Sequence, residues 1–194
     1  TKSKSSIGNT GRCYYVSSLH GDDANDGAED QPLKSLYAVN RLKLQPGDQV
    51  LLERGSVFEN QFLHLNVQGT KEQPIYIGAY GNGAKPLIQT NGQGIWYQDY
   101  GTTLDSPAHV YQGYVSSAVL LYDVEHVVIH DIEISNQAVE ILGEDYSAPH
   151  KMNRTGVAVV AKDKGVRSGI TLRNLSIHDV NGNVYDKHMN NGGI

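Results

Sequence analysis

Short apolar runs alternate with polar corners along the second half of the chain. Residues 156–160, 170–172 and 175–177 form three such runs, and polar residues separate them. Residues 117–134 show the same order of runs and corners one unit earlier. Strands of about three residues joined by tight polar turns are typical of a parallel β-helix, in which each unit adds one coil to a solenoid.

The spacing between equivalent apolar residues of successive units is nearly constant. It is 38 and then 37 positions for the first run, and 43 positions for the second and third runs. The equivalent residues are Val119, Val157 and Ile194 in the first run, Ile129 and Leu172 in the second, and Ile134 and Ile177 in the third. This repetition predicts an all-β parallel β-helix whose strands pair in this register. Two unrelated antiparallel hairpins are the alternative.

The first part of the chain predicts a strand followed by a short capping helix. Residues 14–17 alternate as an edge strand. After Pro32, apolar residues recur at helical spacing until Pro46 and Gly47 end the pattern, and such a helix would cover the open first coil. We therefore predict a flexible segment at 1–13, a strand and capping helix at 14–48, and the first β-helix coils at 49–194, which continue into a C-terminal remainder of the same protein.

Composition favours a turn-rich β protein. The 194 residues include 21 Gly and 12 Tyr. A net charge of −5 without a basic block argues against nucleic acid as a partner. No run of about 18 apolar residues is present, which argues against a membrane-spanning helix. The lone Cys13 neither requires nor excludes export.

Five motifs follow one another in a distinctive order within the first half of the chain. They are YYVS at 14–17, GDDANDG at 21–27, QPLKSL at 31–36, PGDQVLL at 46–52 and QPIYIGAYG at 73–81. This order resembles the N-terminal part of right-handed parallel β-helix proteins of the pectate-lyase-like superfamily, and most of all the chondroitinase-B kind of polysaccharide lyase. The resemblance implies a secreted, periplasmic or cell-surface protein that acts on carbohydrate, but it does not determine the reaction. Together with the groove residues described below, it leads us to predict an enzyme that cleaves an acidic, uronate-containing polysaccharide, such as a glycosaminoglycan, by β-elimination.

Long loops would line a groove beside the first strand of each coil. Residues 91–116 are rich in aromatic side chains, which suit stacking on sugar rings, although packing over a strand edge explains them equally well. The loops at 135–155 and 178–192 carry basic and amide side chains. The repeat spacing stacks Asn153 on Asn190 and Arg154 on Asn191, about 4.8 Å apart.

Cations and amides beside a groove suit an anionic sugar. They would bind a uronate carboxylate and acidify its α proton, which a basic side chain then removes. The predicted catalytic residues are His188, His150 and Arg154, and the predicted substrate-binding residues are Asn153, Asn190, Asn191, Lys151, Trp96 and Tyr185. The resemblance implies calcium as a candidate cofactor, but the sequence assigns no ligands to it. The acidic loop at 20–27 fits either a calcium loop or a simple turn.

Two other functions agree with the same pattern. A β-helix glycoside hydrolase would need two carboxyl groups about 5 to 9.5 Å apart across the groove. The available carboxylates are Glu140, Glu144, Asp145, Asp179 and Asp186. A non-catalytic carbohydrate-binding β-helix would keep the loops but would need no acid and base.

Overall fold

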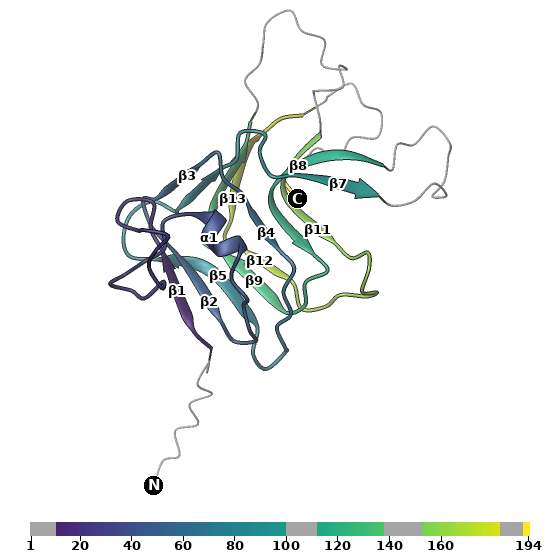
Figure 1. The fold of residues 1–194 in the computed structure, drawn as a ribbon. Helices are drawn as coiled ribbons and strands as arrows, with labels where there is room; N and C mark the ends of the chain where they lie inside the picture. Colours follow the sequence, from purple (N-terminus) through teal and green to yellow (C-terminus); the bar gives the residue numbers. More distant parts are fainter. Residues whose placement is uncertain (1–10, 100–111, 138–152, 183–191) are drawn as a thin grey trace, which may run out of the picture.

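The computed structural model describes residues 11–99, 112–137, 153–182 and 192–194. Over these residues the protein is all-β, with three mainly parallel sheets and one helix of five residues (Figure 1). In the described part of the chain, no helix has the length and apolar composition that crossing a membrane requires.

Each pass of the chain adds strands to the three sheets in turn. The first sheet has the order β1 (Cys13–Val16), β2 (Gln49–Glu53), β5 (Ile75–Tyr80), β9 (Val127–His130) and β12 (Thr171–Arg173). The second has the order β3 (Val57–Glu59), β6 (Leu87–Gln89), β10 (Glu133–Asn136) and β13 (Ser176–Val180). The third has the order β4 (Leu63–Leu65), β8 (Gln112–Tyr122) and β11 (Asn153–Val160), and β7 (Ile95–Asp99) pairs antiparallel with β8. From β2 onward the chain visits the first, second and third sheets in that order and then begins again.

The strand pairings confirm the register predicted from the sequence. The paired residues are Val119 with Val157, Ile129 with Leu172, and Ile134 with Ile177, all in parallel strands. Gly192 also forms a parallel bridge with Thr155, which continues the spacing of 37 positions. The alternative of two antiparallel hairpins is therefore wrong for these strands.

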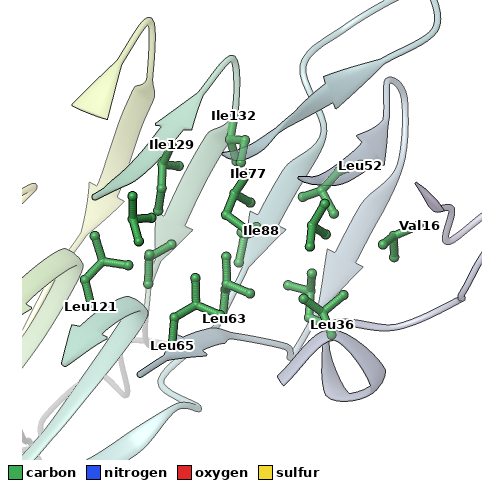
Figure 2. Packing of buried hydrophobic residues seen from close by; sticks show 14 of the residues in the cluster. Val16, Leu36, Leu52, Leu63, Leu65, Ile77, Ile88, Leu121, Ile129 and Ile132 are labelled. Carbon is green, nitrogen blue, oxygen red and sulfur yellow. The ribbon is translucent and has the colours of Figure 1, made fainter. Parts of the chain in front are cut away.

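One apolar core lies between the three sheets (Figure 2). Each sheet contributes fully buried side chains to it, for example Ile77 from the first, Ile88 from the second and Leu63 from the third. Within β2, Val50 and Leu52 are buried while the residues between and beside them are only half-buried. This period of two is what one buried face of a strand requires.

The helix α1 (Leu36–Asn40) is shorter than the predicted helix. Leu33 lies in extended chain and forms a parallel bridge with Val16, so the helix cannot begin at Pro32. The hydroxyl of Ser35 accepts a hydrogen bond from the Ala38 N–H at 3.2 Å and caps the helix start. Leu36 is fully buried in the core.

The carboxylates of the acidic loop at 20–27 hold backbone N–H groups. Asp23 accepts hydrogen bonds from the N–H groups of Lys34 and Ser35, both at 2.8 Å. Asp22 and Asp26 each accept from the backbone N–H two residues later. These bonds favour the interpretation of this segment as a turn, because they occupy oxygens that a calcium ion would need.

Tight corners connect the first sheet to the second. Asp131 and Asn174 occupy equivalent corners with φ of 59° and 51°, a left-handed conformation that short polar residues tolerate best. The Asn174 amide donates to the Asp131 carboxylate, and Lys85 Nζ donates to the Asn174 carbonyl at 2.7 Å. The polar break between the predicted runs at 170–172 and 175–177 is therefore a tight turn.

Candidate functional site

The chain enters the third sheet where β7, the start of β8 and the start of β11 meet. We call residues 92–99, 112–117 and 153–155 the entry region. The sequence predicted one aromatic loop at 91–116, but residues 95–99 and 112–116 pair as an antiparallel ribbon. This ribbon projects beyond the body of the three sheets (Figure 1). Strongly strand-forming Ile, Trp, Tyr and Val side chains make up the paired segments, and that signal could have identified them.

A buried amide joins the strands of this region. Asn136, at the end of β10, is fully buried and donates hydrogen bonds to the carbonyls of Ser116 and Thr155 at 3.2 and 3.1 Å. Its amide oxygen accepts from the Gly92 N–H at 2.9 Å. One side chain of the second sheet therefore fixes both β8 and β11 of the third sheet and the segment that leads into β7.

Trp96 is turned toward the third sheet. Its indole N–H donates to the Ser117 hydroxyl at 2.8 Å, and that hydroxyl lies 2.6 Å from the hydroxyl of Thr155. Gly94 makes this close approach possible, because a Cβ atom there would lie 2.4 Å from the Ser117 carbonyl oxygen and its φ is +65°. The indole N–H of Trp96 is thus used inside the protein.

His64 supports the same segment from β4. Its Nε2 lies 2.9 Å from the carbonyl oxygen of Ser117, so the ring must carry its proton on Nε2. Burial lowers the pKa of His64 and favours the neutral ring at pH 7. His64 therefore acts as a neutral donor that anchors β8.

The structure describes three of the predicted site residues. Asn153 is 9% exposed and begins β11, and Arg154 follows it at 8% exposed. Trp96 is half-buried in β7. The other predicted site residues lie outside the described residues; they are His188, His150, Asn190, Asn191, Lys151 and Tyr185. The predicted stacking of Asn153 on Asn190 and of Arg154 on Asn191 stays a prediction for the same reason.

Arg154 lies against the backbone of its surroundings. Its guanidinium donates to the Asn181 carbonyl at 3.2 Å, and its Nε would be 3.3 Å from a Cβ atom at Gly92. Burial lowers the pKa of Arg154, although an arginine stays charged at neutral pH. The predicted catalytic role of Arg154 stays a prediction.

The exposed aromatic side chains of the ribbon are Tyr97 and Tyr114, which are 52% and 65% exposed. Sequence reasoning singled out Trp96 by residue type instead. In a strand, neighbouring side chains point to opposite faces, so only the pairing of β7 with β8 decides which aromatic residue faces solvent.

A histidine joins two carboxylates on the second sheet. His178 Nε2 lies 2.8 Å from a Glu133 oxygen, and its Nδ1 lies 2.9 Å from an Asp179 oxygen. The hydrogen bond with Asp179, followed by the one with Glu133, raises the pKa of His178. The two carboxylates therefore favour the protonated imidazolium form of His178.

This cluster predicts a pH-dependent contribution to stability. Because the folded-state pKa of His178 is raised, the contribution is complete below its unfolded pKa of about 6.5 and is lost as the pH rises through the folded-state pKa. The His178 side chain is 43% exposed, so we expect the loss to be at most about 1 kcal/mol. Urea unfolding at acidic and alkaline pH should show this loss in the wild type and not in His178→Gln. An equal pH dependence in both proteins would contradict it.

No group of three His, Cys, Asp or Glu side chains within residues 11–99, 112–137, 153–182 and 192–194 is placed to hold a metal ion. Calcium as a cofactor therefore stays a prediction.

Comparison with known proteins identifies related enzymes. No family model matches the chain. The lacto-N-biosidase of Bifidobacterium longum subsp. longum is 43% identical over 210 residues, which cover 95% of this chain and 13% of that protein. The chain thus spans a small part of the length of its curated relative.

Solved structures give a closer match. Two crystal structures of the GH136 lacto-N-biosidase from Eubacterium ramulus, one native and one a selenomethionine derivative, share 80% identity with this chain at a TM-score of 0.89. The match covers 94% of this chain and 29% of each solved chain. A rhamnogalacturonan lyase matches at 19% identity and a TM-score of 0.53, which shows a shared fold alone.

These comparisons correct the family and reaction predicted from the sequence. The chondroitinase-B kind of polysaccharide lyase, β-elimination and a glycosaminoglycan substrate are wrong, because the relatives with high identity are glycoside hydrolases. The motifs that carried the resemblance shape the backbone of the first strands and do not determine the chemistry. Along nearly its whole length, the chain is similar to a segment of GH136 lacto-N-biosidases.

Proposed function

We propose that this chain is a segment of a GH136-type glycoside hydrolase that acts as a lacto-N-biosidase. The observation that carries the proposal is the 80% identity over 94% of the chain to the enzyme from Eubacterium ramulus. The TM-score of 0.89 supports a shared backbone fold over this segment. The proposed substrate is an oligosaccharide that contains lacto-N-biose, which is a neutral sugar, in place of the predicted uronate chain.

The proposal includes a right-handed parallel β-helix as the architecture. The three parallel sheets, the repeated order of visits to them and the single shared core support it. We assign α1 the role of a short N-terminal cap, supported by the burial of Leu36 in the core beside the first strands. The proposed division of the chain into an N-terminal segment (1–13), a strand and cap (14–48) and β-helix coils (49–194) is kept. The greater length of the relatives supports further coils in a remainder of the same protein.

Hydrolysis of a glycosidic bond needs two carboxyl groups, one to protonate the leaving oxygen and one to act as nucleophile or base. Among the predicted candidates, Glu140, Glu144, Asp145 and Asp186 lie outside the described residues, and Asp179 is bound to His178. Asn136 is bonded to the backbone next to the entry to β11. In the sequence, Glu140, Glu144 and Asp145 fall between Asn136 and Asn153, which lie against and in the entry region. We therefore propose that the substrate groove lies beside the entry region, and that Arg154 and the ribbon contribute to binding.

The test is to incubate the complete protein with a human milk oligosaccharide that ends in lacto-N-biose, in water labelled with heavy oxygen. We expect mass spectrometry to find released lacto-N-biose, with one heavy oxygen atom at each new reducing end and no ultraviolet absorbance from a C4–C5 double bond. Chondroitin sulfate serves as the matched acidic control, and we expect it to remain intact.

Two results would contradict the proposal. Cleavage of chondroitin sulfate with rising ultraviolet absorbance would identify a lyase. Tight retention of the oligosaccharide without any released disaccharide would favour the non-catalytic binding protein considered from the sequence. The same assay with a chelator tests the calcium prediction, and cell fractionation tests the predicted secreted, periplasmic or cell-surface location.

A further inference from the structure

The β7–β8 ribbon has two unlike faces. Residue pairs directly opposite each other are Tyr97 with Tyr114, Trp96 with Val115, and Ile95 with Ser116. Because side chains alternate along a strand, Tyr97, Tyr114 and Ile95 share one face, and Trp96 and Val115 share the other. The second face packs onto the protein, since Val115 is 3% exposed and Trp96 bonds to Ser117.

Three large side chains of the first face are exposed. Ile95, Tyr97 and Tyr114 are 51%, 52% and 65% exposed, and we call these three residues the aromatic platform. The two tyrosine rings meet edge to face, with centroids 5.1 Å apart and planes at 71°. An edge-to-face contact restricts the rotation of both rings, and the exposed fractions leave ring surface open to solvent. Exposed aromatic pairs of this kind add little to the core.

The charge of the ribbon restricts what can bind there. Within residues 95–99 and 112–116 the only charged residue is Asp99, and it lies on the same side as the platform. The paired segments carry no Lys, Arg or His side chain that would bind an anionic ligand such as a uronate. The axial C–H groups of a neutral pyranose ring, in contrast, form an apolar patch about the size of one aromatic ring.

We propose that the aromatic platform is a binding subsite that stacks a neutral hexopyranose ring of an oligosaccharide. This rests on the proposed function for the choice of sugar. Tyr114, which is the more exposed ring, provides the stacking surface, and Tyr97 holds it in position from the neighbouring strand. The ribbon joins the body of the protein at the entry region, so a sugar on the platform continues the groove there.

The experiment measures binding of the complete protein by calorimetry. The probe is a sulfur-linked analogue of a neutral human milk oligosaccharide, which a glycosidase cannot hydrolyse. We expect Tyr97→Ala and Tyr114→Ala each to weaken binding about 5- to 20-fold, because either change removes buried ring area. Tyr114→Phe keeps the ring and should bind within about 2-fold of the wild type. Tyr37→Ala removes another exposed tyrosine, which pairs edge to face with Phe62, and is the matched control.

Turnover of the natural oligosaccharide is measured on the same variants. A higher KM with nearly unchanged kcat is expected for the two alanine variants, as for a remote binding contact. If both alanine variants bind with wild-type affinity, the proposed subsite is wrong, even when hydrolysis of the oligosaccharide supports the proposed function. Equal weakening by Tyr114→Phe and Tyr114→Ala overturns stacking and assigns the contact to the hydroxyl. If the alanine variants lose binding and the wild type shows no turnover, the platform is supported and the proposed hydrolase is refuted. If the wild type does not bind the analogue, the proposed platform is wrong.

Discussion

Replacing Phe58 with alanine should lower the free energy of unfolding by about 3 to 5 kcal/mol. Phe58 is fully buried in the shared core and lies in β3, where it pairs with Ile88 of β6. The substitution removes apolar contacts within the shared core and leaves a cavity there. Since a domain of this kind is stable by about 5 to 15 kcal/mol, the variant should unfold at much lower urea concentration.

The neighbouring Val57→Ala variant is the matched control. Val57 is in the same strand but points outward and is 45% exposed, so its truncation should change stability by no more than about 0.5 kcal/mol. Urea unfolding of both variants measures the difference. Similar losses in the two variants would mean that the strand pairing of β3, and not the packing of the core, determines its contribution.

The sequence predicts the strand register well for a physical reason. In stacked parallel strands, Val119 must meet Val157 and Ile129 must meet Leu172, because an offset by one position would turn every apolar side chain away from the core. Equal spacing in the sequence is therefore direct information about pairing. The helix was predicted too long because a buried apolar residue can lie in a helix or in extended chain. Leu33 is buried in extended chain.

The reaction could not be predicted from the motifs that were recognised. In the PGDQVLL motif, Gly47 adopts a φ of 89°, and the Asp48 carboxylate accepts hydrogen bonds from the N–H groups of Arg12 and Gln45 at 2.7 and 2.8 Å. These residues specify a turn before β2 and carry no catalytic information. A lyase and a hydrolase can share such a turn, so the motif does not distinguish between them.

The site was also only partly predictable. The sequence located the entry to the third sheet, since Asn153 and Arg154 lie there. It could not show that Trp96 faces inward and Tyr97 outward. The two residues are neighbours on one strand, and the segment that contains this strand and its partner was predicted to be a loop. Nor does Asn136 have any signal in the sequence that separates it from an exposed corner asparagine, although it is fully buried.

The amide of Asn136 provides a second test with a large expected effect. It connects three sheet strands and the segment before β7 through bonds to the backbone of Ser116, Thr155 and Gly92. In Asn136→Asp the shape is kept, but an oxygen replaces the nitrogen that donates to two carbonyl groups. A buried carboxylate facing two carbonyl oxygens is strongly unfavourable, so we expect a loss of about 3 to 5 kcal/mol at pH 7.

The same substitution makes stability depend on pH in a known direction. Burial and the two carbonyl oxygens favour the protonated acid, so the folded-state pKa of the new carboxyl group is raised above its unfolded value of about 3.9. The folded state then holds a proton that the unfolded state releases, and stability falls as the pH rises above about 4. At pH 4 the neutral acid can still donate one hydrogen bond, so the deficit relative to the wild type should be smaller than at pH 7. Urea unfolding at both pH values measures this change, with Asn66→Asp at an exposed position as the control. An equally small loss at both pH values would show that the Asn136 amide does not hold the entry region together.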